Sequence, residues 1–267
     1  MDVDEFGQQT NQCRLEFMPS FRLHLADQEV PMTRGLAALV VSVVLEGERT
    51  SRRMLQARMW PDLSPSDGSK RLRQLLWRVG RATDNRLLEV TTENVSLSAD
   101  VLVDLHHAEE RARKIVDDEE MCTDPLEWRF LRFELLAGWA DDRVVEMRAR
   151  WDRLRMMTLE HLAEKFLEAG KFVDAIETAN AASTVDSLSE ASHRILATAY
   201  LRREDPASAW RVYVKYRALL LQEIGLEPSS NFRELFSDAR VMHTAKQKPS
   251  KAAPGRTSIQ STQVTLM

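Results

Sequence analysis

A repeat of 34 residues in the C-terminal half is the strongest constraint on how this chain folds. Shifting the sequence by 34 places superposes six pairs of apolar or small residues: Leu162 on Leu196, Ala163 on Ala197, Phe166 on Tyr200, Leu167 on Leu201, Ala175 on Ala209 and Ile176 on Trp210. This period, with small residues where two helices cross, is typical of tetratricopeptide repeats. Gly170 and Asp205-Pro206 stand where the turn within each helix pair is expected. Because two such units cannot bury their faces alone, we expect flanking helices over 142–157 and 229–240 to stack on them.

The N-terminal third has a different order of elements, which predicts a winged helix. Residues 14–25 partly alternate apolar and polar side chains around a Pro-Ser break, as paired strands do, and a turn follows at 26–28. An apolar run over 36–45 ends at Gly47 and predicts a buried helix. Ser51 is placed to cap a second helix, which Trp60-Pro61-Asp62 ends. A third helix over 69–82 and a hairpin around 91–94 complete the pattern.

Together these patterns predict a mainly α fold with a small β component. An N-terminal winged helix-turn-helix domain is followed by an all-α, tetratricopeptide-like helical repeat domain.

The charge of the chain is distributed unevenly. The 37 Lys and Arg against 41 Asp and Glu give a net charge of −4, which by itself is no argument for binding a polyanion. Between residues 34 and 86, however, eleven basic residues stand against five acidic ones, so this segment carries +6 and the remainder −10. The acidity of the remainder therefore conceals a basic element within residues 34–86.

The predicted third helix is the centre of that basic element. Leu72, Leu75, Leu76 and Val79 form one apolar stripe at helical spacing, and the basic and amide side chains fall on or beside the opposite face. Arg pairs with guanine and Gln with adenine in the major groove, so we expect Gln74 and Arg78 to read bases. Phosphate contacts position a protein without reading sequence. The predicted DNA-binding residues of this helix are Lys70, Arg71 and Arg81 on phosphates, with Arg73, Gln74, Trp77 and Arg78.

Three of these assignments have an alternative. Most charged faces of amphipathic helices are simply solvated, although the surrounding winged-helix pattern favours DNA recognition. Arg52 and Arg53 follow the expected cap at a helix N-terminus, where they either hold a phosphate or are plain surface charge. Trp77 either stacks on a sugar or a thymine methyl group or packs against the wing, and packing is slightly favoured.

Four segments in this order resemble the antibiotic regulatory protein (SARP) family. They are Arg-Met-Trp-Pro-Asp at 58–62, Leu-Arg-Gln-Leu-Leu-Trp-Arg-Val at 72–79, Val-Asp-Leu-His at 103–106 and Glu-Ile-Gly-Leu-Glu-Pro at 223–228. The resemblance spans roughly residues 14–240. It implies an OmpR-type winged helix joined to a bacterial transcriptional activator domain.

The resemblance also implies a function and partners. It describes a transcription activator that binds direct repeats near promoters in double-stranded DNA, self-associates there as head-to-tail copies, and recruits RNA polymerase. Two departures from the family pattern stand out. The wing at 92–97 has no basic residue and one acidic residue, and Gly80 stands where a basic residue is common, which should soften the end of the helix.

On this basis we expect four segments in the chain. Residues 1–13 are a disordered N-terminus, 14–105 the winged-helix DNA-binding domain, 106–243 the activator domain and 244–267 a disordered tail. The rival interpretation is a protein-interaction adaptor of the tetratricopeptide type, in which a degenerate winged helix does not read DNA. The acidic wing is the best argument for this rival.

The remaining residues argue against an enzyme and against a metal or cofactor site. The chain has no glycine-rich phosphate loop followed by Lys, no Gly-x-Ser-x-Gly turn and no His-Glu-x-x-His helix. His106-His107 lacks a third ligand at useful spacing, and two cysteines, Cys13 and Cys122, are too few for a disulfide framework. No apolar run approaches the roughly 20 residues that span a bilayer. We therefore expect a cytoplasmic protein that does not bind membranes.

Overall fold

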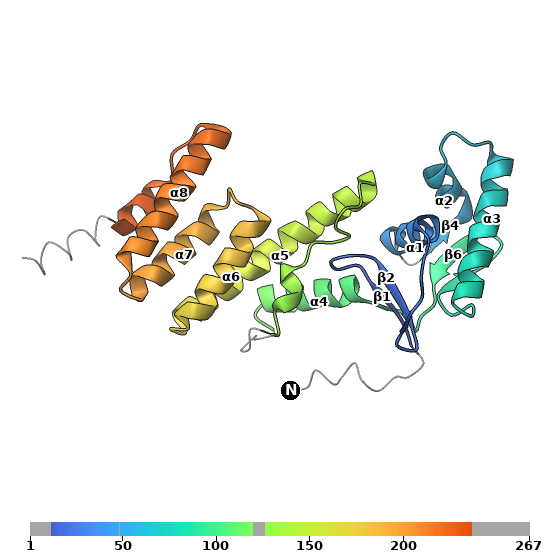
Figure 1. The fold of residues 1–267 in the computed structure, drawn as a ribbon, viewed down its shortest axis with the longest axis horizontal. Coiled ribbons are helices and arrows are strands. Elements are labelled where there is room, and N and C mark those ends of the chain that lie inside the picture. Colours follow the sequence, from blue (N-terminus) through green and yellow to red (C-terminus); the bar gives the residue numbers. More distant parts are fainter. Residues whose placement is uncertain (1–11, 48, 120–125, 237–267) are drawn as a thin grey trace, which may run out of the picture.

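The molecule is elongated, with the winged-helix elements at one end and a row of helices extending to the other (Figure 1). The computed structural model describes residues 12–47, 49–119 and 126–236. The mainly helical fold class predicted from the sequence is confirmed. The segments predicted as disordered, 1–13 and 244–267, lie outside the described residues apart from positions 12 and 13.

A four-stranded sheet lies where the two parts of the molecule meet. Its strand order is β3-β2-β1-β7, formed by β1 (Cys13–Glu16), β2 (Arg22–Leu25), β3 (Gln28–Glu29) and β7 (Leu102–Val103). β1 and β2 are antiparallel, which confirms the predicted hairpin. β1 begins one residue before the expected start at 14, because Cys13 pairs with Leu25 and is buried. Burial raises the pKa of the Cys13 thiol to about 11.

Three helices and a second, smaller sheet form the rest of the winged helix. The helices are α1 (Arg34–Glu46), α2 (Arg52–Met59) and α3 (Pro65–Ala82), and the sheet has the order β4-β6-β5, from β4 (Thr50–Ser51), β5 (Leu88–Val90) and β6 (Asn94–Leu97). The predicted buried helix is α1, and Gly47 ends it with a φ of 91°. The predicted wing hairpin is the β5-β6 pair.

The third helix starts four residues earlier than the sequence pattern predicted. Ser64 is its N-cap, where the side-chain hydroxyl accepts a hydrogen bond from the Asp67 amide at 3.2 Å. Pro65 follows in the first helical position, where its missing N–H has no helical partner to lose. The added turn carries Asp67 and Gly68, which bear no apolar period, so spacing alone did not reveal it.

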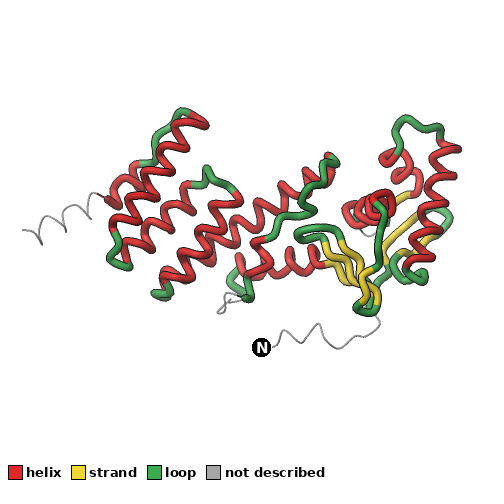
Figure 2. The backbone as a smooth tube through the Cα atoms, viewed as in Figure 1, coloured by secondary structure: helices red, strands yellow, loops and turns green. Residues whose placement is uncertain are grey.

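The second part of the molecule is helical. It contains α4 (Asp104–Val116), a short 3-10 helix η2 (Arg129–Arg132), α5 (Asp142–Glu168), α6 (Phe172–Val185), α7 (Glu190–Arg202) and α8 (Pro206–Ile224). Successive helices from α5 to α8 pack side by side (Figures 1 and 2). Within the described residues none of these helices is both long and apolar enough to cross a bilayer.

The 34-residue repeat corresponds to the helix pairs α5-α6 and α7-α8. The four superposed alanines are fully buried at the crossings: Ala163, Ala175, Ala197 and Ala209. Gly170 turns the chain between α5 and α6 with a φ of 73°, and Asp205 caps α8 by accepting from the Ser208 amide at 2.9 Å.

The flanking helices differ from the prediction in one respect. The expected helix at 142–157 is not separate, because α5 runs unbroken for 27 residues into the first repeat. At the other end residues 230–236 are helical, while 237–240 lie outside the described residues. Phe232 and Phe236 pack there on Tyr213 of α8.

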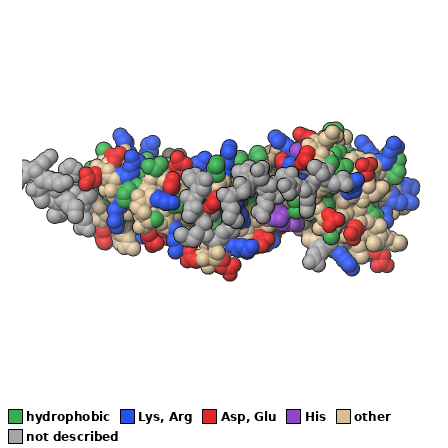
Figure 3. Space-filling view, turned by 90° about the horizontal axis from the view of Figure 1, so that it is seen from below, with side chains coloured by type: hydrophobic (Ala, Val, Ile, Leu, Met, Phe, Trp, Pro, Cys, Tyr) green, Lys and Arg blue, Asp and Glu red, His purple; other side chains and the backbone are tan. Residues whose placement is uncertain are grey.

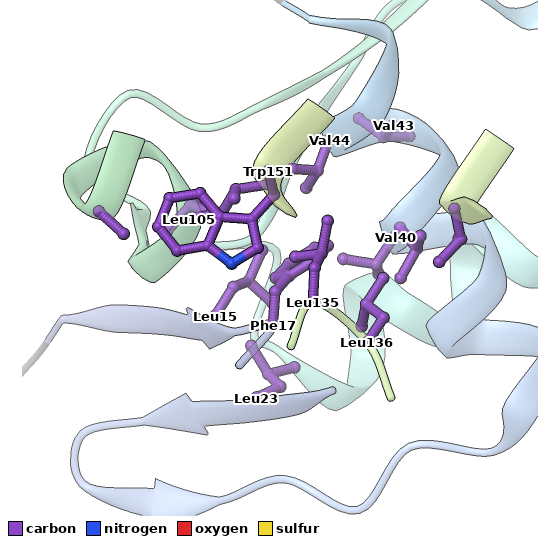
Figure 4. Close-up of a cluster of buried hydrophobic side chains, with 14 of the residues drawn as sticks. Leu15, Phe17, Leu23, Val40, Val43, Val44, Leu105, Leu135, Leu136 and Trp151 are labelled. Atoms are coloured by element: carbon purple, nitrogen blue, oxygen red, sulfur yellow. The ribbon is translucent and has the colours of Figure 1, made fainter. Parts of the chain in front are cut away.

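One buried apolar cluster joins the sheet to the helical part. Trp151 of α5 and Leu105 of α4 lie with Leu15 and Phe17 of the β1 segment and with Val40 of α1 (Figure 4). Backbone hydrogen bonds add to this contact, since the Leu136 and Ala137 amides donate to the Phe17 and Pro19 carbonyls at 2.8 and 2.7 Å. The winged helix and the helix row are therefore held together by a common core.

Asp104 ties the start of α4 to the end of β1. Its carboxylate accepts hydrogen bonds from the Phe17 amide at 2.8 Å and the Met18 amide at 3.1 Å. Burial nevertheless dominates and raises the pKa of this carboxyl to about 6. Asp104 thus stands at the junction as a titratable group with an unusual pKa.

Candidate nucleic-acid interface

The outward face of α3 carries the predicted DNA-binding side chains. Leu72, Leu76 and Val79 are buried against the core, so the helix presents the opposite face to solvent. Lys70, Gln74, Trp77 and Arg81 recur along the middle of that face, flanked by the exposed Arg71, Arg73 and Arg78. Lys and Arg side chains gather at the end of the molecule that α3 forms (Figure 3). The helix therefore displays a basic, amide-bearing surface at the tip of an elongated molecule.

Most of these donors are not committed to partners within the protein. Lys70 forms an ion pair with Asp67 at 3.3 Å, and Arg73 Nε donates to the Ser69 carbonyl at 3.4 Å. Exposed pairs of this kind contribute little to stability and exchange readily with another anion. Within the described part of the chain, Gln74 and Arg78 have no hydrogen-bond or ion-pair partner. Their planar donor groups remain available to a ligand.

Trp77 is largely exposed to solvent, which argues against its predicted packing on the wing. Its side chain is 61% exposed, on the middle of the outward face of α3. The guanidinium carbon of Arg81, one turn further along, lies 5.3 Å from the centroid of the indole ring. The wing turn lines a cleft with Ser69 and Arg73, which lie two turns and one turn before Trp77 on α3.

The wing reaches the N-terminus of α2. The Arg52 amide donates to the Glu93 carbonyl at 2.8 Å, and the Arg52 guanidinium donates to the Thr91 carbonyl at 3.1 Å. Ser51 stands at the N-cap position, but its hydroxyl makes no capping hydrogen bond, contrary to the prediction. The reason is that Ser51 also pairs with Asn94 as part of β4, so the wing satisfies the end of the helix. Arg53 remains exposed at this helix end.

A polar cleft lies between α2, α3 and the wing turn. It brings together the predicted residues Arg52, Arg53 and Arg73 with six others: Ser51, Gln56, Ser69, Thr92, Glu93 and Asn94. The sequence did not identify these six as one group, because β4 is two residues long and carries no periodic signal. The cleft offers amide and hydroxyl donors beside the basic side chains, while Glu93 places a carboxylate at the wing turn.

Gly80 has a role that helix propensity did not reveal. The helix continues past it to Ala82, and the chain then turns back through Asp84 and Asn85, which both have positive φ. The Asn85 amide donates to the Gly80 carbonyl at 2.8 Å, and a Cβ on residue 80 would lie 2.5 Å from the Asn85 side-chain oxygen. Glycine at this position leaves room for the turn that leads into β5.

Within residues 12–47, 49–119 and 126–236, no three His, Cys, Asp or Glu side chains are arranged to hold a metal ion.

Comparison with known proteins finds a family match over part of the chain and weaker similarity over most of it. Residues 128–240 match the bacterial transcriptional activator domain. The chain is 24% identical over 220 residues to "Regulatory protein AfsR" of Streptomyces griseus, an alignment that covers 77% of this chain and 22% of the relative. The chain thus spans about a fifth of the length of that protein.

A solved structure has the same fold. It is Mycobacterium tuberculosis EmbR, determined in complex with a low-affinity phosphopeptide. The TM-score is 0.66 at 17% sequence identity, over 87% of this chain and 65% of that one. The domain match, the AfsR similarity and the EmbR fold agree with the resemblance seen in the sequence. The chain therefore resembles regulators of the SARP type over most of its length, and its residues 128–240 match the bacterial transcriptional activator domain.

Proposed function

We propose that the protein is a sequence-specific DNA-binding transcription activator in which α3 enters the major groove. The observation that carries this proposal is the outward face of α3, where exposed Lys, Arg and Gln side chains stand on a helix whose other face is buried. An α-helix fits the major groove, and planar donors on its surface reach the base edges.

The individual roles follow from the chemistry of each side chain. Gln74 and Arg78 read bases, because both present uncommitted planar donors. Lys70, Arg71 and Arg81 contact phosphates and supply affinity without sequence information. Arg73 is placed beside the polar cleft, where a phosphate next to α3 would lie.

The α2 end of the cleft contributes a second phosphate contact. Arg53 is exposed there and is the better candidate of the predicted pair. The Arg52 guanidinium already donates to the Thr91 carbonyl, so the main effect of this side chain is to hold the wing turn against α2. The wing itself adds an acidic group rather than a basic one.

The two parts of the chain then divide the work. Residues 14–105 bind direct repeats near promoters as head-to-tail copies, and residues 106–243 contact RNA polymerase or a neighbouring copy. The common core around Trp151 supports this division, because it holds the helix row at a fixed orientation to the DNA-binding helix.

Glu93 in the wing turn favours a second candidate function. A protein-interaction adaptor would use the helical repeats to hold a partner, and its winged helix would dock without reading DNA. The two functions differ in whether the exposed face of α3 binds duplex DNA.

The salt dependence of binding to duplex DNA tests the proposal. If α3 contacts phosphates, the logarithm of the association constant falls linearly with the logarithm of salt concentration, by about 0.9 for each phosphate neutralised. We expect a steep slope for promoter-proximal fragments from the source genome. Arg202→Ala, an exposed position in the last turn of α7 far from α3, is the control and should leave the slope unchanged. Absence of binding at low salt would favour the adaptor.

A further inference from the structure

Trp77 is a large apolar side chain in the middle of a basic face. It is 61% exposed, and its neighbours on that face are Lys70, Gln74, Arg78 and Arg81. Aromatic side chains gain free energy when their large area is removed from water, so a ligand that covers this indole would be bound more tightly. The buried stripe on the opposite side of α3 already satisfies the core, so packing within the described fold gives Trp77 no role.

Arg81 holds the indole in place. Its guanidinium lies over the ring, 5.3 Å from the centroid, in the geometry of a cation–π contact between residues one turn apart. This stacking limits the rotamers open to Trp77 and leaves the rest of its apolar surface facing outward. A side chain fixed in this way loses less freedom when it meets a ligand.

The major groove offers one apolar feature that matches such a surface. Its edges present hydrogen-bond acceptors and donors on every base pair, and in addition the C5 methyl group of thymine. Gln74 and Arg78 supply hydrogen-bonding groups on either side of Trp77, whereas the indole supplies mainly apolar area. The neighbours can therefore read polar edges, and the indole is suited to the methyl group.

We infer that Trp77 recognises a thymine methyl group in the major groove, with Arg81 as the positioning residue that holds the indole against it. The inference rests on the proposed function, since it assigns a base preference to the DNA-binding face of α3. Helix neighbours three or four positions apart are about 5–6 Å apart, and base pairs are about 3.4 Å apart. The thymine therefore lies within one or two base pairs of a base read by Gln74 or Arg78.

Replacing thymine by deoxyuridine tests this assignment directly. The change removes only the methyl group and keeps base pairing and the O4 acceptor. The probe is the duplex that the whole 267-residue chain selects most strongly from a random-sequence pool, with each thymine replaced in turn. For the wild-type protein we expect one or two positions at which uracil lowers affinity about fourfold, the loss that corresponds to one buried methyl-sized group.

Variants of Trp77 identify the side chain responsible. Trp77→Ala should bind the thymine and uracil duplexes with equal affinity at those positions, and Trp77→Phe should retain part of the difference. Lys70→Ala is the matched control on the same face. It should weaken binding to both duplexes by the same factor and leave the preference for thymine unchanged.

Arg81→Lys separates positioning from phosphate contact. Lysine keeps the charge but lacks the planar group that stacks on an indole. The salt dependence of binding should therefore stay as in the wild type, while the preference for thymine over uracil falls. A role of Arg81 in phosphate contact alone would leave that preference intact.

Three outcomes would overturn the inference, and they are distinguishable from failure of the proposed function. A selected duplex that binds tightly but tolerates uracil at every position leaves DNA binding standing and removes the methyl contact. Equal thymine preference in the wild type and Trp77→Ala assigns the contact to another residue. If Trp77→Ala binds a single DNA site with normal affinity but no longer binds two adjacent sites cooperatively, Trp77 contacts a second copy of the protein instead of DNA. Selection of no duplex at all would instead reject the proposed function.

Discussion

At the scale of single residues, side chains of the same charge differ in their partners and in their burial. Lys70 and Arg78 both lie exposed on α3, yet Lys70 pairs with Asp67 as a point charge and Arg78 keeps an uncommitted planar fork. Asp104 is one of many acidic residues, but burial raises the pKa of its carboxyl to about 6. Such differences decide which substitutions are informative.

Arg78→Ala and Lys70→Ala should differ in how they weaken DNA binding. Loss of a bidentate base contact costs about 1–3 kcal/mol and relaxes the preference at one base pair. Loss of a phosphate contact weakens all sequences similarly and flattens the salt slope by about 1. Titrations of both variants with the selected and with scrambled duplexes measure the two effects. Equal losses on both duplexes for both variants would contradict the assignment of Arg78.

Asp104 should make stability depend on pH in an unusual direction. The folded carboxyl keeps its proton up to about pH 6, whereas its ordinary pKa is 3.8, so the folded state binds more protons between these values. The free energy of unfolding should therefore fall as pH rises from about 4 to about 6, by roughly 2–3 kcal/mol from this group. Denaturant unfolding of the wild type and Asp104→Asn at several pH values isolates this contribution. Identical pH profiles would refute it.

At the scale of elements, local signals located the helices but not all of their ends. The apolar spacing of α3 predicted its buried face, while its first turn depends on the Ser64 cap and Pro65. The 34-residue period placed both repeat turns, but the same period could not indicate that α5 continues through the predicted flanking helix. The short strands β4 and β7 exist only through pairing with distant partners, which no local pattern encodes.

Phe166→Ala should destabilise the helical repeats strongly. Phe166 is 4% exposed between packed helices, and truncation of a buried Phe costs about 3–5 kcal/mol. Tyr200, its counterpart in the second repeat, is only partly buried, so Tyr200→Ala should cost less. Val173→Ala, at a 55% exposed position on α6, is the control and should leave the thermal midpoint nearly unchanged. Melting curves by circular dichroism compare the three variants, and unchanged midpoints for both aromatic variants would argue against inter-repeat packing.

At the scale of the whole molecule, the two parts share one core. Trp151 belongs to α5 in sequence, but it packs beside Leu15 and Phe17 and donates its indole N–H to the Phe133 carbonyl at 3.0 Å. Arg148 adds to this junction by donating to the Leu135, Leu136 and Trp139 carbonyls. The helix row is therefore packed directly against the sheet and α1 of the winged helix.

Trp151→Ala should accordingly destabilise both parts of the chain. Removal of a fully buried Trp costs about 3–5 kcal/mol, and here the cavity would open into the winged helix as well as into α5. Hydrogen exchange followed by mass spectrometry should show faster exchange in β1 and α1 as well as in α5. Exchange that rises in α5 alone would show that the two parts are energetically independent.

The sequence by itself determined the class of fold, the repeat and the identity of the basic helix. These depend on period, caps and local charge, which are encoded within a few helical turns. The basic segment at 34–86 was therefore visible in the sequence despite the net charge of −4. The tertiary structure decided which side chains share the site. In the structure Trp77 is exposed with the Arg81 guanidinium over its ring, and the Arg52 side chain donates to the wing turn. Gln56 and Ser69 line the cleft, and the two parts of the chain share a core around Trp151. These arrangements arise from contacts between segments far apart in the chain, and a local pattern holds no information about them.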